Sequence, residues 1–177
     1  PVDADGDSLG ATLALGAVFR RFVDAEVVVV ADVPARYSWM QGAESVVPNE
    51  ALEGAFDVVI VMDGDKDRLA PKVEHAFRES KTKAIVDHHR TTDPSGYDLV
   101  ILDPGAAATC VQVLSIFDAW EERLTADIAE LLYVGLLFDT GGFRYSNTKP
   151  GTHEAAGRLL ATGFDHAAVA ARVLMET

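Results

Sequence analysis

The chain has 177 residues, 49% of them hydrophobic and 24% charged, and its 28 acidic against 15 basic residues give a net charge of −13. Such a chain can build one well-packed domain, but it suits a long nucleic-acid duplex poorly, because duplex phosphates are bound by clustered Lys and Arg. Cys110 is the only cysteine, which excludes an internal disulfide and a cysteine-rich zinc cluster. No apolar run approaches the ~18 residues that span a bilayer, so we expect a cytoplasmic protein without a membrane partner.

Short apolar runs alternate with helical patterns along the chain. Near-continuous Val, Ile and Leu predict strands at 26–32, 57–63, 82–87 and 97–103. Apolar residues at helical spacing predict helices at 7–22, 69–80, 106–120, 125–139, 151–163 and 165–176. Continuous apolarity is typical of parallel strands that are buried on both faces. The alternation therefore predicts an α/β fold with a doubly wound, mostly parallel sheet flanked by helices, which binds ligands outside the carboxyl ends of its strands.

The first residues, PVDADGDSLG, read as an acidic loop that leads into the first helix. A loop of this kind needs a preceding strand to hold it in place. We therefore expect the first strand of the domain to lie ahead of Pro1.

Acidic residues stand at the ends of several predicted elements. They are Asp5 and Asp7 before or at the first helix, Asp63 after the strand at 57–62, Asp87 with His88 and His89 after the strand at 82–86, and Asp139 after the helix at 126–138. Any one Asp could be an ordinary turn or helix-cap residue. If these ends meet at one edge of a parallel sheet, however, their like charges repel unless cations lie between them.

Carboxylates with one or two imidazoles and no thiolate favour Mn²⁺ or Mg²⁺ over a structural zinc. Two such ions that share a carboxylate can activate a water molecule and hold a phosphoryl group during in-line displacement. In this interpretation Asp87 orients its neighbour, His88 binds a metal, and His89 remains free to meet the phosphate. The sequence thus predicts two Mn²⁺ ions, with Mg²⁺ as a substitute, and phosphoester hydrolysis.

The segments DGDSLGA, VIVMDGD, VDHH and LLFDTGGFRYSNT, in this order, resemble the DHH phosphoesterase superfamily, in particular its nano-RNase and 3′-phosphoadenosine-5′-phosphate phosphatase branch. The resemblance covers essentially the whole chain and implies a DHH catalytic domain over 1–177. The implied metal ligands are Asp5, Asp7, Asp63, His88 and Asp139, with Asp63 bridging the two ions. The implied substrate contacts are His89 and the site walls Arg144, Ser146 and Asn147. His89 and Asp63 are the implied catalytic residues. Asp87 is expected to lie behind the ligands and to support them.

The sequence departs from the family pattern in two places. The family carries a metal-binding His shortly before its first Asp pair, and Pro1 stands at that position here, which should weaken one metal position. A register that takes Asp3 and Asp5 as the pair resembles RecJ-type nucleases, although DSLGA fits the first register better. The family also has a second, substrate-binding domain, so we expect the chain to be the catalytic domain alone.

These features predict a manganese-dependent phosphohydrolase that acts on short nucleotides. The substrate classes are short oligonucleotides, cyclic dinucleotides and nucleoside 3′,5′-bisphosphates. Two alternatives remain: a non-catalytic DHH-like domain that binds a nucleotide or a protein, and an enzyme like family II inorganic pyrophosphatase, which DTGGFRYSNT disfavours. The sequence leaves the oligomeric state open, a homodimer included.

Overall fold

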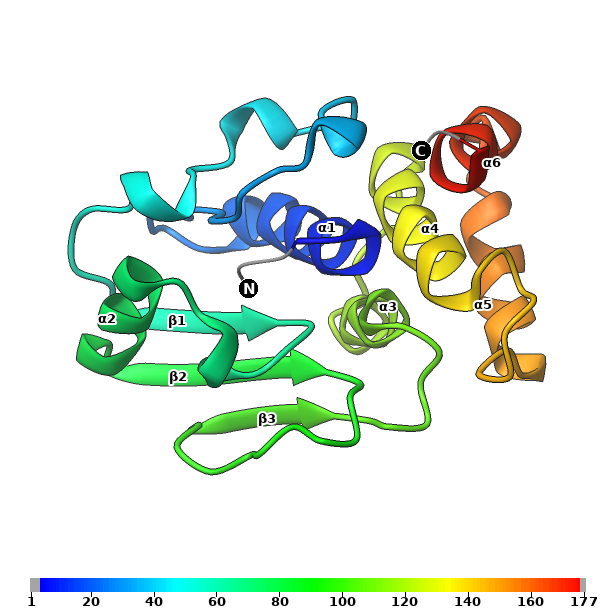
Figure 1. The fold of residues 1–177 in the computed structure, drawn as a ribbon. Coiled ribbons are helices and arrows are strands. Elements are labelled where there is room, and N and C mark those ends of the chain that lie inside the picture. Colours follow the sequence, from blue (N-terminus) through cyan, green and yellow to red (C-terminus); the bar gives the residue numbers. More distant parts are fainter. Residues whose placement is uncertain (1–3, 176–177) are drawn as a thin grey trace.

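The computed structural model describes residues 4–175, so Pro1 and Asp3 lie outside it. Within these residues a parallel sheet of three strands is accompanied by six α-helices (Figure 1). The bounds are α1 Gly6–Phe22, β1 Val58–Met62, α2 Pro71–Glu79, β2 Thr82–Asp87, β3 Leu99–Leu102, α3 Thr109–Ala119, α4 Ala126–Thr140, α5 Pro150–Leu160 and α6 His166–Met175. Short 3-10 turns are η1 Ala35–Tyr37, η2 Ala43–Ser45, η3 Asn49–Ala51 and η4 Lys66–Arg68. The predicted α/β class is confirmed.

The sheet has the strand order β1-β2-β3, with both pairs parallel. Met62 lies opposite Val86, and Asp87 lies opposite Leu102. Just beyond the end of β1, the backbone N–H of Asp63 donates to the carbonyl of Val86 over 3.0 Å. The carboxyl ends of β1 and β2 therefore meet at one edge, as the sequence predicts.

The strand predicted at 26–32 is wrong. In the part of the chain that the structure describes, this segment has a single parallel bridge, between Val30 and Val47, and belongs to no sheet. Its apolar residues are buried all the same, since Val29 is 3% and Ala31 6% exposed. The apolar run therefore predicts burial correctly, although it does not form a strand. A strand, however, also needs a neighbouring backbone along its length, and the described residues do not supply one.

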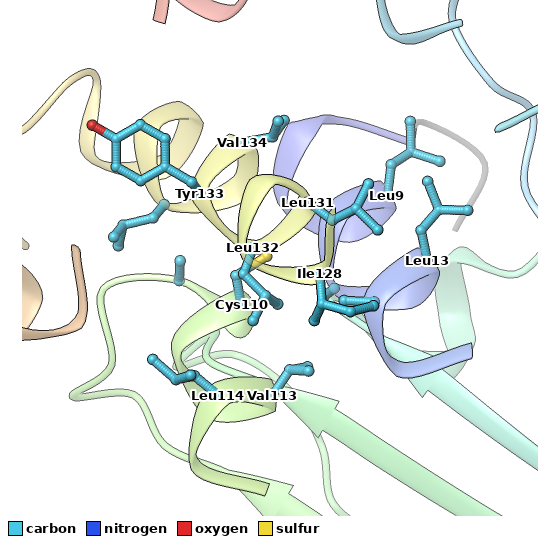
Figure 2. Packing of buried hydrophobic residues seen from close by; sticks show 14 of the residues in the cluster. Leu9, Leu13, Cys110, Val113, Leu114, Ile128, Leu131, Leu132, Tyr133 and Val134 are labelled. Carbon is cyan, nitrogen blue, oxygen red and sulfur yellow. The ribbon is translucent and has the colours of Figure 1, made fainter. Parts of the chain in front are cut away.

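Helices α1, α3 and α4 form the main core beside the sheet. Figure 2 shows how their side chains meet, with Leu9 and Leu13 from α1, Cys110 and Val113 from α3, and Leu132 from α4. Helix α4 is buried on nearly all sides and lies deep in the fold. No helix among residues 4–175 combines the length and the apolar character needed to cross a membrane.

Candidate metal centre

Four side chains from four elements converge at the carboxyl edge of the sheet. His88 Nε2, at the end of β2, lies 2.9 Å from Asp139 Oδ2, 3.6 Å from Asp63 Oδ1 and 4.0 Å from Asp7 Oδ2. Asp7 is the second residue of α1, Asp63 follows β1, and Asp139 lies in the last turn of α4, which continues to Thr140. The predicted convergence of these four residues is therefore seen in the structure.

The carboxylates of this cluster lie in an environment that disfavours their negative charge. Asp7 is fully buried, and burial together with Asp63 and Asp139 raises its pKa well above the usual range. Burial, Asp5 and Asp139 likewise raise the pKa of Asp63 to about 6. Asp63 also adopts a φ of 53°, in the left-handed region that non-glycine residues rarely occupy. Negative groups forced together in this way form a favourable place for a cation.

The orientation of His88 suits a metal ligand. Its Nδ1 lies 3.3 Å from the carbonyl oxygen of Ala106, to which it can donate, and this leaves the lone pair on Nε2. Nε2 is buried and, despite its short distance to Asp139, makes no hydrogen bond of acceptable geometry with any residue from 4 to 175. Burial acts to lower the pKa of His88, but Asp139 and Asp7 outweigh it and raise the pKa to about 9. A metal ion would take the place of that proton.

Two groups of potential ligands can be distinguished among the described residues. One consists of Asp7, His88 and Asp139, and the other of Asp63, His88 and His89; within each group the ligand atoms lie within 4.8 Å of one another. The donors are carboxylate oxygens and imidazole nitrogens, which fit the divalent ions predicted from the sequence. His88 is common to both groups, whereas Asp63 belongs to one. The bridging role of Asp63 therefore stays a prediction.

Asp5 has a different environment from the other predicted ligands. It is the N-cap of α1, where its Oδ1 accepts hydrogen bonds from the N–H groups of Asp7 (3.1 Å) and Ser8 (3.0 Å). It belongs to neither of the ligand groups found among residues 4–175. Its charge nevertheless contributes to the raised pKa of Asp63, so it lies close to the cluster. Only its other carboxylate oxygen, Oδ2, is left to bind an ion. A metal-binding role for Asp5 therefore remains a prediction.

Asp87 supports the pair of histidines. Its Oδ1 accepts hydrogen bonds from the backbone N–H of His88 (2.9 Å) and from Nδ1 of His89 (2.7 Å), and its Oδ2 accepts one from the hydroxyl of Thr92. Burial acts to raise the pKa of Asp87, but the hydrogen bonds from His89 and Thr92 outweigh it and leave the pKa below its usual value. The carboxylate thus stays charged and fixes the ring of His89, which is half-exposed at the rim.

Sequence reasoning missed the part that α3 plays in the site. The backbone N–H groups of Thr109 and Cys110 donate to Asp7 over 2.6 and 2.9 Å, and the hydroxyl of Thr109 donates to Asp63 Oδ1 over 3.0 Å. The N-cap of α3 is Ala108, whose side chain cannot cap a helix. Asp7 supplies the missing acceptor from across the fold. The sequence analysis placed residues 106–108 inside the helix, so the missing cap at Ala108 could not be recognised.

The predicted substrate contacts lie in the turn after α4. Asn147 Nδ2 donates to the carbonyls of Ala107 and Asp139, each over 3.0 Å, and so ties this turn to the cluster. Arg144 is exposed, and its Nε donates to the carbonyl of Gly141 over 2.6 Å. Ser146 is exposed in the same turn. The amide of Asn147 therefore has a structural task, while Arg144 and Ser146 remain candidates for substrate contact.

The fold and the site together define a class of protein: a parallel α/β domain whose carboxyl edge collects carboxylates and imidazoles into a candidate divalent-metal centre. The particular family follows from comparison with known proteins. The model of the family described as "DHH family, N-terminal domain" matches residues 2–136 of the chain. The chain therefore belongs to this family.

Known relatives are similar along most of the chain. Over 163 residues it is 31% identical to the bifunctional oligoribonuclease and PAP phosphatase NrnA of Thermus thermophilus, covering 92% of this chain and 48% of that protein. NrnA of Bacillus subtilis is 28% identical, with coverages of 90% and 50%. An exopolyphosphatase-related protein from Bacteroides fragilis has the same fold, with a TM-score of 0.84 at 22% identity, over 97% of this chain and 54% of that one. The chain thus spans about half the length of the relatives it matches.

Proposed function

We propose that this domain is the catalytic part of a metal-dependent phosphohydrolase that acts on short nucleotides. The observation that carries the proposal is the position of His88 Nε2, which is buried within 4.0 Å of carboxylates from three other elements. Such a cluster in an otherwise acidic chain stores negative charge that a divalent cation would neutralise. The family and its phosphohydrolase relatives support the same reaction class.

Each group of the cluster has a separate task in this proposal. Asp5, Asp7, Asp63, His88 and Asp139 would hold the two ions, with Asp63 as the ligand that both ions share. Asp7, His88 and Asp139 lie close enough together to bind one of them. Bound Mn²⁺ supplies an activated water and a clamp for phosphoryl oxygens. The amide groups of α3 fix the carboxylate of Asp7 before any ion arrives, so the ligands need little rearrangement on binding.

His89 is proposed to meet the phosphate. Its Nδ1 is bound to Asp87, so Nε2 is the atom left to face a substrate at the rim. The hydrogen bond to Asp87 is the main factor that raises the pKa of His89, which favours a ring that carries a proton. A protonated ring can stabilise the negative charge that develops on phosphate oxygens in the transition state. Asp87 and Thr92 keep that donor in one orientation.

The names of the relatives support a substrate class. Both similar NrnA proteins are described as oligoribonucleases and PAP phosphatases, which points to short oligonucleotides and nucleoside 3′,5′-bisphosphates. Cyclic dinucleotides remain a third substrate class of the proposal. The exposed Arg144 and Ser146, in the turn after α4, are proposed to contact an anionic substrate.

The test is a substrate panel on the full-length protein with Mn²⁺. The panel contains a dinucleotide, a cyclic dinucleotide, 3′-phosphoadenosine-5′-phosphate and inorganic pyrophosphate. Turnover of one of the first three that disappears on chelation and returns with Mn²⁺ supports the proposal. Turnover of pyrophosphate alone would indicate the pyrophosphatase alternative. Binding of a nucleotide without turnover of any compound would indicate the non-catalytic alternative.

A further inference from the structure

Tyr145, in the turn after α4, is an exposed aromatic residue that no other side chain covers. Among the residues that the structure describes, three aromatic side chains are exposed: Phe22 at 58%, Tyr145 at 57% and Trp120 at 44%. Phe22 and Trp120 pack against each other, with ring centroids 6.4 Å apart. No ring and no cationic side chain from residues 4–175 stacks on Tyr145. Its ring is therefore available to a flat group that binds from solution.

One face of the Tyr145 ring lies on the backbone of Gly141. A Cβ on Gly141 would be 2.5 Å from Cζ of the ring and 2.7 Å from both Cε1 and Cε2. Such a point lies above the plane of the ring, because a point in the plane at this end would meet the hydroxyl oxygen first. Gly141 has a φ of 57° and carries no side chain that would lift the ring. The opposite face of the ring is therefore the exposed one.

The turn that carries Tyr145 is fixed to the last residue of α4. The carbonyl of the fully buried Thr140 accepts hydrogen bonds from the N–H groups of Arg144 (2.9 Å) and Tyr145 (3.0 Å), and its hydroxyl accepts one from the N–H of Phe143 (3.0 Å). Phe143 has a φ of 67°, which is rare for a bulky residue and persists only where the surroundings impose it. The ring of Tyr145 is thus presented by a turn that is held in one shape.

The exposed ring stands beside both an arginine and the candidate metal centre. Gly141 follows Asp139 by two residues, so their Cα atoms are at most about 7.6 Å apart. Arg144 Nε donates to the carbonyl of Gly141 over 2.6 Å, which leaves the other N–H groups of its guanidinium for an anion. One glycine thus anchors a flat aromatic surface and a cation next to the carboxylate cluster. A molecule that matches all three features carries a phosphate group and a flat ring.

We propose that the exposed face of Tyr145 is the platform on which a nucleobase of the substrate stacks, an inference that rests on the proposed phosphohydrolase function. Every base has a π-face, so a single aromatic ring binds bases without distinguishing among them. Tyr145 therefore selects nucleotides over inorganic phosphate compounds, while Arg144 holds a phosphate next to the stacked base. The ring takes no part in bond cleavage, and its contribution is to substrate affinity.

Fluorine NMR of the full-length protein labelled with 3-fluorotyrosine tests the contact without any turnover. Mg²⁺ replaces the paramagnetic Mn²⁺, and Tyr145→Phe identifies the resonance of Tyr145. AMP should shift this resonance, whereas ribose 5-phosphate, the same molecule without its base, should leave it in place. The resonance of Tyr97, whose hydroxyl is bound to Asp65, is the internal control and should not move. A Tyr145 resonance that AMP does not shift, because the ring is covered by the rest of the full-length chain or for any other reason, overturns the proposal. So do equal shifts with both compounds.

Steady-state kinetics of the full-length protein with Mn²⁺ give the second measurement. Tyr145→Leu should raise KM for a dinucleotide by about 5- to 100-fold, the usual value of one stacked base, with little change in kcat. Tyr145→Phe keeps the ring and should recover most of that loss. Phe22→Leu is the matched control, because it removes an equally exposed ring at the end of α1 that lies away from Asp7. An unchanged KM in Tyr145→Leu overturns the proposal. Absence of turnover in the unmodified protein would contradict the proposed function instead, and the NMR titration then decides whether Tyr145 binds a base.

Discussion

Gly135 of α4 lies so close to Asp7 of α1 that a side chain has no room between them. A Cβ on Gly135 would be 2.5 Å from Asp7 Oδ1 and 2.3 Å from Cys110 Sγ. The carboxylate of Asp7, on α1, is therefore fully buried between α4 and the N-terminus of α3.

Gly135→Ala should therefore destabilise the protein by about 1–3 kcal/mol, because α1 or α3 must shift to accept the methyl group. The matched control is Gly157→Ala in α5, where a Cβ would meet nothing within 4 Å. That substitution should stabilise the protein by roughly 0.5–1 kcal/mol through helix propensity. Denaturant unfolding of both variants gives the comparison. Equal changes in the free energy of unfolding would show that the helices around Gly135 accept the methyl group without strain.

Thr109→Val should weaken Mn²⁺ binding by about 10- to 100-fold, as is usual when a partner behind a ligand is lost. The hydroxyl of Thr109 donates to Asp63 Oδ1, and valine keeps the shape without the donor. Thr109→Ser keeps the hydroxyl and should retain most of the affinity. Calorimetric titration of the three proteins with Mn²⁺ is the measurement. Equal losses in both variants would show that packing, not the hydrogen bond, matters here.

Asp63→Ala should abolish binding of both metal ions if its carboxylate bridges them, whereas His88→Ala should leave one ion bound. Metal content per folded chain, measured after dialysis against Mn²⁺, distinguishes the two variants. The reverse pattern, with both ions lost only in His88→Ala, would make His88 the shared ligand, as its membership of both ligand groups allows. Circular dichroism confirms that each variant is folded.

His89→Ala should lower kcat of the full-length enzyme by about 10²- to 10³-fold, which is the typical cost of losing a preorganised donor to transition-state charge. Metal content should not change if His89 contacts the phosphate and no ion. His88→Ala is the comparison, because it should reduce both kcat and metal content. Loss of an ion in His89→Ala would instead place His89 among the ligands, in the group it forms with Asp63.

The metal-free protein should become less stable as the pH rises above 4. Burial and neighbouring charges raise the pKa of Asp63 from 3.8 to about 6, and the carboxylates around His88 raise its pKa from 6.5 to about 9. A raised pKa stabilises the fold below the unfolded-state value, and this stability is lost as the pH passes the folded-state value. The loss should therefore occur between about pH 4 and 6 for Asp63 and between about pH 6.5 and 9 for His88.

Melting temperatures measured across this range in a chelator test the expectation. Asp63→Asn should flatten the part of the curve between about pH 4 and 6, because the amide cannot titrate. Added Mn²⁺ should raise the melting temperature more at high pH, where the ligands have lost their protons. A melting temperature that rises steadily from pH 4 to 9 without metal would contradict the prediction.

The sequence by itself determined the α/β class and most of the elements. The strand predicted at 82–87 is β2 to the residue, because a run buried on both faces needs continuous apolar side chains. The parallel arrangement then brings Asp63 and His88 to one edge, since parallel strands end on the same side. These conclusions depend on local periodicity and on one rule of topology, and both can be read from a single chain.

Only the tertiary structure decided how each acidic residue is used. Asp5 caps its own helix, whereas Asp7, two positions later, accepts hydrogen bonds from α3, more than 100 residues away in the chain. The hydroxyl of Thr109 supports Asp63 from 46 residues further along the chain, and the space beside Asp7 is left by Gly135 of α4. Sequence patterns record which side chains are buried or polar along one element. They do not record which distant backbone meets them, because that is set by the packing of helices against one another.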